Sequence, residues 1–177
     1  MPISQAQQLQ AVLFASGEPY EAAKLAQVLG LDRTTLERLV DSVNESYKKF
    51  PFQILRLGEC YQMTTKEQYA PIIKEALEIR RDAPLSQAAL EVLAIIAYNQ
   101  PVTKSFVEQV RGVDSGSVVN SLVAKELVEE AGRLEIPGRP IAYRTTANFL
   151  RCFGMKDIQA LPRIPEPQPQ ETAEQNP

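Results

Sequence analysis

Side chains able to do covalent or acid-base chemistry are sparse in this sequence. Among its 177 residues there is no histidine, and the two cysteines are Cys60 and Cys152. Without histidine, the Ser-His-Asp and Cys-His arrangements of hydrolases are excluded, as is the commonest nitrogen ligand of metals. The pair Glu129-Glu130 would point to opposite faces of a strand, which is poor geometry for concerted acid-base work. We therefore expect no catalytic, cofactor-binding or metal-binding residue, and a protein that is not an enzyme.

Neither a nucleotide site nor a phosphate-binding surface is indicated. The sequence lacks a G-x-x-x-x-G-K-[ST] loop and a G-x-G-x-x-G after a strand. Lys and Arg number 19 against 22 Asp and Glu, giving a net charge of −3, and no basic arm or stripe stands out. No apolar run approaches the roughly 20 residues that cross a bilayer, and no signal-like stretch opens the chain. We expect a cytoplasmic protein with reduced cysteines and no membrane contact.

The elements that position the remaining side chains come in two copies. Residues 2–32 align without a gap on residues 84–114, so that Ser4, Pro19 and Gly30 fall on Ser86, Pro101 and Gly112. The apolar positions between them also agree in kind, with Leu25 on Val107 as one example. A repeated core pattern predicts two similar domains, with boundaries 1–81 and 82–161. The Pro-rich residues 162–177 carry few apolar groups and are expected to be a disordered tail.

Each copy reads as three helices followed by a hairpin. A serine caps the first helix, a break at proline starts the second, and a glycine in left-handed conformation followed by aspartate (Asp32 or Asp114) separates the second from the third. Strands follow at 52–57 and 60–64 in the first copy, and at 127–131 and 141–145 in the second; a closing helix is expected at about 66–81. The predicted fold is mainly α with small β-hairpins (α+β), as two tandem winged-helix domains.

A winged helix often reads DNA with its third helix, so a DNA-binding transcription regulator is one hypothesis. The charges lean the other way. In the first copy Arg33 and Arg38 are balanced by acidic neighbours, and in the second the third helix begins acidic and carries only Lys125 near its end. A protein-binding use of the fold is therefore favoured, with the DNA regulator kept as the alternative.

Three motifs in the second copy carry a resemblance to a known family. They are Leu85-Ser-Gln-Ala-Ala-Leu-Glu-Val-Leu-Ala-Ile-Ile-Ala-Tyr-Asn-Gln-Pro-Val-Thr103, Val110-Arg-Gly-Val-Asp-Ser115, and Ile136-Pro-Gly-Arg-Pro-Ile-Ala-Tyr-Arg-Thr-Thr146. With Val12-Leu-Phe-Ala-Ser-Gly-Glu-Pro19 near the start, the sequence resembles the segregation and condensation protein B (ScpB) family over about residues 7–162. Three motifs in the right order make this resemblance specific.

The resemblance implies a non-catalytic subunit of a bacterial condensin-like complex. In that family a ScpA kleisin bridges an SMC ATPase, and ScpB binds ScpA largely through its C-terminal domain while pairing as a homodimer through its N-terminal domain. The implied role is chromosome condensation and partition at cell division, at the nucleoid. Contact with the SMC ATPase would run through the kleisin, and any DNA contact would be indirect or weak.

Within this framework we single out candidate partner-binding residues. The helix at 86–98 is apolar almost all round, either because small alanines let neighbours pack closely or because one face is a ScpA groove; the groove would contain Leu93, Ile96 and Tyr98. The loop Pro137-Gly138-Arg139-Pro140 either presents Arg139 rigidly to ScpA or merely turns the chain, with Arg139 paired to a local carboxylate.

The first helix offers candidates for the homodimer interface, Leu9 and Phe14. Phe14 is turned about 100° from the face that carries Leu9 and Leu13, so it either packs against the wing or marks a second contact surface. The cysteines are expected to behave as small hydrophobic side chains without chemistry.

Overall fold

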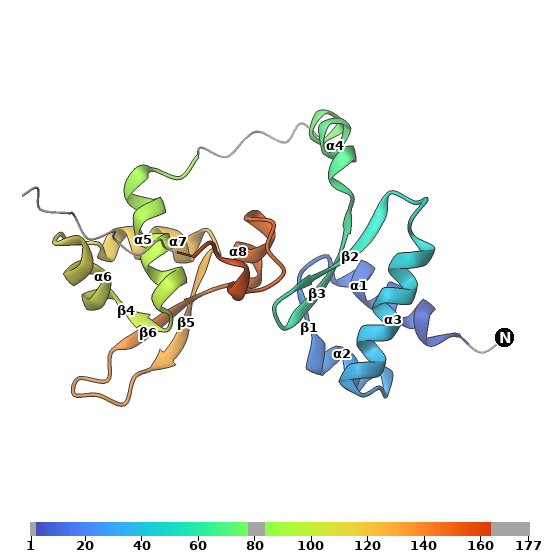
Figure 1. Cartoon of the computed structure of the whole chain (residues 1–177), viewed down its shortest axis with the longest axis horizontal. Coiled ribbons are helices and arrows are strands. Elements are labelled where there is room, and N and C mark those ends of the chain that lie inside the picture. Colours follow the sequence, from blue (N-terminus) through green and yellow to red (C-terminus); the bar gives the residue numbers. More distant parts are fainter. Residues whose placement is uncertain (1–2, 78–83, 164–177) are drawn as a thin grey trace, which may run out of the picture.

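The computed structural model describes residues 3–77 and 84–163, here called the first and the second half. Each half contains three helices, an antiparallel sheet of three strands and a closing helical segment (Figure 1). The predicted α+β class is confirmed. The predicted domain boundary at 81–82 and residues 164–177 of the predicted tail lie outside the described residues.

In the first half the strands pair in the order β1-β3-β2, with all neighbours antiparallel. The elements, in chain order, are α1 (Gln5–Ser16), β1 (Tyr20–Glu21), α2 (Ala22–Leu29), α3 (Arg33–Ser46), β2 (Phe52–Leu57), β3 (Cys60–Thr65), the 3₁₀ turn η1 (Glu67–Tyr69) and α4 (Ala70–Ala76).

The second half repeats this arrangement with the strand order β4-β6-β5. Its elements are α5 (Gln87–Asn99), β4 (Val102–Thr103), α6 (Lys104–Arg111), α7 (Gly116–Ala124), β5 (Val128–Arg133), β6 (Ile141–Thr145), α8 (Ala147–Cys152) and the 3₁₀ turn η2 (Ile158–Ala160). The two-residue strands β1 and β4 were not predicted, because a pair of residues is too short to show an alternating pattern.

The predicted helix signals act as expected in most places. The Ser4 and Ser86 hydroxyls accept hydrogen bonds from the amides of Gln7 and Ala89, three residues on. Gly30 and Gly112 end α2 and α6 with φ of +66° and +71°, a conformation that glycine adopts without strain.

The two aspartates after these glycines behave differently. Asp32 caps α3 by accepting from the Thr35 amide at 2.9 Å, as predicted. The prediction that Asp114 caps the third helix of the second half is wrong, because the N-cap of α7 is Ser115. The carboxylate of Asp114 instead accepts from the Gly116 amide at 2.9 Å, within the turn before the helix.

Each half has a hydrophobic core of its own. In the first, α1, α2 and α3 enclose Leu9, Leu13, Leu25 and Leu36, all completely buried. In the second, α5 lies at the centre and contributes Ala89, Val92, Leu93, Ile96 and Ala97. α8 closes this second core with Phe149 and Leu150, which are 3% and 7% exposed.

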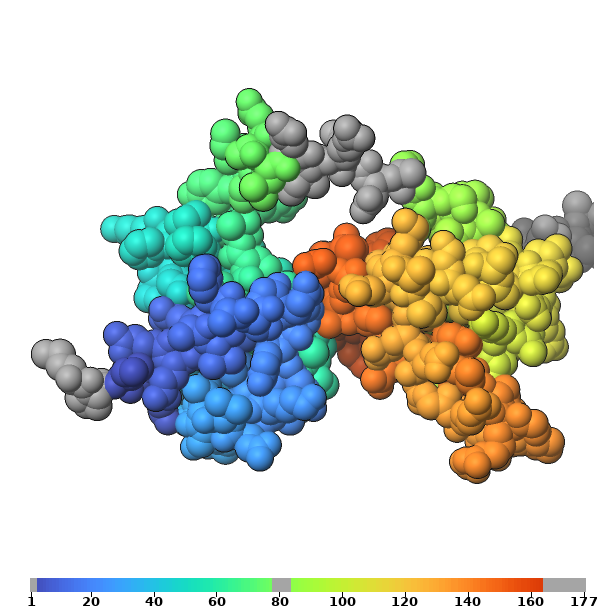
Figure 2. Space-filling model, turned by 180° about the vertical axis from the view of Figure 1, so that it is seen from behind, coloured from blue at the N-terminus to red at the C-terminus, as the bar shows by residue number. Residues whose placement is uncertain are grey.

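The halves touch where the hairpin of β2 and β3 meets α8 and the residues that follow it (Figures 1 and 2). Leu57, at the end of β2, is 3% exposed and belongs to the core of the second half. The next amide, of Gly58, donates a hydrogen bond to the carbonyl oxygen of Lys156 at 2.7 Å. One side chain and one backbone bond therefore tie the hairpin of one half to the closing segment of the other.

The predicted closing helix at 66–81 is shorter than expected. After β3 the chain makes the turn η1 and then α4, which is seven residues long. None of its residues is buried, and Ile72 and Leu77 are 58% and 67% exposed. In Figure 1, α4 stands away from the helices of its own half.

Candidate protein-binding surfaces

The helix α5 was predicted to carry partner-binding residues, and the structure divides them. Leu93 and Ile96 are 2% and 0% exposed, inside the core of the second half. The prediction that their side chains meet a partner is therefore wrong. The physical reason is that α6, α7, the sheet and α8 surround α5, so an apolar helix on nearly all sides is a central helix. The explanation by close internal packing holds for these two residues.

The face of α5 that remains open is a narrow stripe. Leu90, Ala94 and Tyr98 are all exposed and follow one another at intervals of four residues, so they lie on one side of the helix. Leu90 is 42% and Tyr98 40% exposed. The sequence prediction included Tyr98 and missed the other two, although the i, i+4 spacing was available as a signal.

Tyr98 also contacts the end of the described chain. Its hydroxyl donates a hydrogen bond to the carbonyl oxygen of Pro162 at 2.7 Å. Between α5 and residues 158–163 lies an open cavity of about 620 Å³, which Tyr98, Gln100 and Leu161 help to line. Ile158 and Leu161 pack against the second core, so part of the surface of α5 is covered by the chain itself.

The loop that carries Arg139 supports the local-pairing explanation. Arg139 donates to Glu135 at 2.7 Å, and the pair is largely exposed. Arg133 donates to the carbonyl oxygen of Arg139 at 2.9 Å, and Arg139 itself adopts φ of +39°. The guanidinium thus has a local carboxylate and still faces solvent, where an ion pair contributes little and exchanges easily.

The motif at 110–115 has a structural role. Arg111 is an inner residue, with a side chain 13% exposed, and donates to the Ser115 hydroxyl at 2.8 Å and to Glu91 at 3.1 Å. Ser115, completely buried, also donates its amide to Glu108 at 3.4 Å. These bonds hold the turn between α6 and α7 against α5, and they leave no free cation for a ligand.

In the first half, one of the two predicted interface residues is inside the domain. Leu9 is completely buried in the first core, so the prediction that it lies in a dimer interface is wrong. Phe14 is 78% exposed, and the alternative that it packs against the wing is therefore wrong as well. Its position, turned from the buried side of α1, leaves the ring in solvent.

Phe14 borders a groove that sequence reasoning missed. We call it the α1 groove; its volume is about 340 Å³, and it is lined by Gln7, Gln10, Ala11, Phe14, Tyr47, Phe52 and Met63. Tyr47 makes edge-to-face contacts with Phe50 and Phe52, at ring-centroid distances of 6.3 Å and 6.1 Å. Burial raises the pKa of Tyr47. Three aromatic residues between 47 and 52 were the available signal, since large exposed aromatic rings mark contact surfaces.

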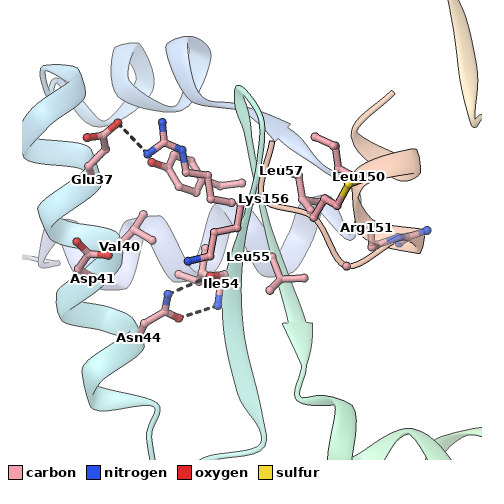
Figure 3. Close-up of a pocket in the computed structure, with 14 residues that line it drawn as sticks. Glu37, Val40, Asp41, Asn44, Ile54, Leu55, Leu57, Leu150, Arg151 and Lys156 are labelled. Carbon is pink, nitrogen blue, oxygen red and sulfur yellow. Dashed lines mark hydrogen bonds and ion pairs between the residues drawn. The ribbon is translucent and has the colours of Figure 1, made fainter. Parts of the chain in front are cut away.

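A second cavity, of about 470 Å³, lies between the halves (Figure 3). Its walls come from α3 and β2 on one side and from α8 and the residues after it on the other. Arg56 pairs with Glu37 at 3.4 Å, and the Asn44 side chain bonds both the amide and the carbonyl oxygen of Ile54, at 2.7 Å and 2.9 Å. Its polar groups are thus engaged with one another.

The thiols and carboxylates do not assemble into reactive groups. Burial raises the pKa of the Cys60 thiol, which favours its protonated form. Cys152 is exposed on α8, not enclosed by apolar neighbours as predicted. Across residues 3–77 and 84–163, no cluster of three metal-ligating side chains occurs, and no helix has both the length and the hydropathy needed to span a bilayer.

These features define a small two-core α+β protein whose distinctive surfaces are apolar stripes and grooves. The family model described as "Segregation and condensation complex subunit ScpB" matches residues 7–164. The chain belongs to this family, and the resemblance seen in its motifs is confirmed.

Individual relatives agree with this assignment. The segregation and condensation protein B of Ruminiclostridium cellulolyticum is 43% identical over 158 residues, covering 88% of this chain and 83% of the relative. The crystal structure of ScpB from Mycobacterium tuberculosis has 26% sequence identity and a TM-score of 0.42, and covers 88% of this chain and 99% of that one. A crystal structure described as a dimer of the ScpB N-terminal domain complexed with ScpA peptide has 22% identity and a TM-score of 0.38, covering 40% of this chain and 91% of that one.

Proposed function

We propose that this chain is a non-catalytic adaptor subunit of an SMC complex, in which it binds a ScpA-like kleisin and reaches the SMC ATPase through that kleisin. The match of residues 7–164 to a family described as a complex subunit carries this proposal. Its work would be done by surfaces, in chromosome condensation and partition during cell division, at the nucleoid in the cytoplasm. Contact with DNA would be indirect or weak.

We further propose that each half is a winged-helix domain, with residues 1–81 serving dimerisation and residues 82–161 serving kleisin binding. The repeated order of three helices and a hairpin, and the equivalent strand orders β1-β3-β2 and β4-β6-β5, support this assignment. The exposed groove beside Phe14 lies in the first half, and the open stripe of α5 lies in the second.

The kleisin surface is proposed to be the stripe Leu90, Ala94 and Tyr98. A helix with an apolar stripe at this spacing suits a partner segment that presents its own apolar side chains. Tyr98 adds a hydroxyl that now bonds to Pro162 and can be offered to a partner instead. Arg139 is proposed to contribute a weaker contact, exchanging the exposed Glu135 for a partner carboxylate.

Isothermal titration with the full-length kleisin encoded by the same genome tests this proposal. Replacing Leu90 by Glu and Tyr98 by Ala in one chain is expected to weaken binding at least about tenfold, because central apolar contacts dominate interface energies. A matched control is Val110→Glu, an equally exposed apolar position on α6 that the proposal leaves unused. No binding by the unaltered chain at micromolar concentration would contradict the function itself, and equal losses in both variants would contradict the surface.

The charges of α3 support the protein-binding role over the DNA-binding alternative. Arg33 is held by Glu37 at 3.4 Å and by Glu59 at 2.9 Å, and Arg56 is also held by Glu37. Cations engaged in this way are poorly placed to neutralise phosphates. A strong affinity of the purified chain for one duplex sequence, falling steeply with salt, would favour the alternative.

A further inference from the structure

The closing helix of the first half has no partner within its own half. α4 contains no buried residue, although Ile72 and Ile73 are apolar and Leu77 follows at its end. Tyr69, Ile72, Ile73 and Ala76 recur at intervals of three and four, so they form one face of the helix. An amphipathic helix normally buries such a face, and here the face is open.

The first half also has an apolar surface without a partner, the α1 groove. Phe14 and Phe52, on its rim, are 78% and 40% exposed, and Ala11 on its floor is exposed too. The groove and α4 are therefore unpaired surfaces of similar chemistry on one chain.

The internal repeat indicates what belongs in the groove. The offset of 82 residues places Gln7, Gln10, Ala11 and Phe14 on Ala89, Val92, Leu93 and Ile96. Because Ser4 and Ser86 cap the two helices at the same offset, the helical register is preserved. All four residues of α5 are at most 8% exposed, whereas the same positions of α1 line an open groove.

What closes this surface in the second half is the segment after its sheet. There the chain leaves β6 and turns directly into α8, whose Phe149 and Leu150 share one core with the α5 residues. The corresponding segment after β3 is η1 and α4. The second half thus covers its helix with its own closing segment, and the first half does not.

The exit of the chain from β3 is fixed in a way that holds α4 outward. The Lys66 amide donates to the carbonyl oxygen of Pro51 at 2.8 Å, and its ammonium group donates to the carbonyl oxygens of Tyr47 and Lys48 at 2.8 Å and 2.9 Å. η1 begins at the next residue, Glu67. No slack remains at this point for α4 to fold back onto its own groove.

We propose that the α1 groove binds α4 of a second copy of this chain, so that two chains exchange their closing helices across a twofold axis. Ile72, Ile73 and Leu77 of one chain would pack against Phe14, Tyr47 and Phe52 of the other. A reciprocal exchange uses each groove and each helix once and closes the assembly as a dimer. This inference rests on the proposed homodimer and names the surfaces that form it.

Disulfide trapping between chains tests the exchange. In a background with Cys60→Ser and Cys152→Ser, one chain carries Ala11→Cys and another carries Ile72→Cys. After the two chains are mixed, allowed to exchange and oxidised, a covalent dimer joining one of each is expected to be the main product. Lys74→Cys is the matched control, because it lies about 200° around the helix from position 72 and is expected to cross-link at least about tenfold more slowly.

The chain with both cysteines distinguishes the occupants. Exchange predicts a covalent dimer, whereas a closed monomer of increased gel mobility would show that α4 occupies its own groove and would overturn the proposal. Sedimentation of the unaltered chain separates the two levels of failure. A monomer contradicts the proposed homodimer, and a dimer that does not cross-link contradicts the helix exchange alone.

A second pair of variants does not depend on disulfide geometry. Because neither Ile72 nor Phe14 is buried in its own half, Ile72→Glu and Phe14→Glu are expected to retain the circular dichroism spectrum and to raise the dimer dissociation constant at least about tenfold. A chain with Val28→Glu, also an exposed apolar position, is expected to dimerise normally. Unchanged dimerisation of Ile72→Glu and Phe14→Glu would overturn the proposal.

Discussion

The amide of Gly58 donates a hydrogen bond to the carbonyl oxygen of Lys156 at 2.7 Å, across almost a hundred residues of sequence. Beside it, Leu57 of the first half lies in the core of the second. These two neighbours make the hairpin of β2 and β3 part of the packing of α8. A change in the first half should therefore be felt in the second.

Leu57→Ser is expected to loosen α8. Removing a buried leucine from a core costs about 2–5 kcal/mol, and part of that loss falls on the half that contains α8. Hydrogen exchange followed by mass spectrometry should show faster exchange in residues 147–160. The control is Leu29→Ser, a buried position of the first core alone. It should destabilise the first half and leave exchange in α8 unchanged; equal exchange in both variants would contradict the coupling.

Ile96→Ala is expected to destabilise the second half by about 2–5 kcal/mol, because it leaves a cavity in a fully packed core. Urea denaturation followed by circular dichroism measures the loss. Leu90→Ala, two turns away on the exposed stripe of α5, should change the free energy of unfolding by no more than about 0.5 kcal/mol. A stable Ile96→Ala protein would mean that this side chain is not part of the core.

Asn44→Ala should separate α3 from β2. The amide side chain donates to and accepts from the backbone of Ile54, so its loss leaves a strand amide and a carbonyl without partners, at a cost of about 1–3 kcal/mol. Asn44→Asp is the informative comparison, since a carboxylate still accepts from the Ile54 amide but repels the carbonyl oxygen. We expect its loss of stability in urea to be intermediate; identical losses would show that the accepted bond contributes nothing.

Acid should weaken the contact between α3 and the hairpin. Hydrogen bonds from Arg33 to Glu59 lower the pKa of that carboxyl, so the ionised form is favoured in the folded state. Its contribution is therefore present above the ordinary glutamate pKa of about 4.3 and is lost as the pH falls through the lowered value. The stability difference between the wild type and Glu59→Gln should be constant above about pH 5 and shrink below it.

Nuclear magnetic resonance gives a direct check of this pH dependence. The Glu59 carboxyl should titrate at a lower pH in the wild type than in Arg33→Gln, where the donor is gone. The same midpoint in both proteins would show that Arg33 does not hold the carboxylate.

Local features of the fold could be predicted from sequence where one or two residues decide the outcome. Serine caps, glycine in left-handed conformation and alternating strands place most helix and strand positions correctly, because each depends on interactions within a few residues. Asp114 shows the limit, since one residue of difference in the turn moved the cap to Ser115.

The surfaces were harder to predict, because they depend on how the helices assemble. The apolar pattern of α5 does not reveal which of its residues face α8, so Leu93 and Ile96 were placed on a surface that only Tyr98 occupies. The α1 groove combines residues of α1 with Tyr47, Phe52 and Met63, which come together only in three dimensions. The short α4 gave a correct amphipathic pattern but no indication that its own half leaves it uncovered.

The place of Leu57 has a practical consequence for dissecting the molecule. A fragment ending before residue 84 would carry this leucine, together with Leu55, without the α8 side chains that cover them here. Such a piece would have a sticky new face that the intact protein never displays, and its self-association would mix an artefact of truncation with genuine pairing. Measurements of stoichiometry are therefore best made on uncut polypeptide.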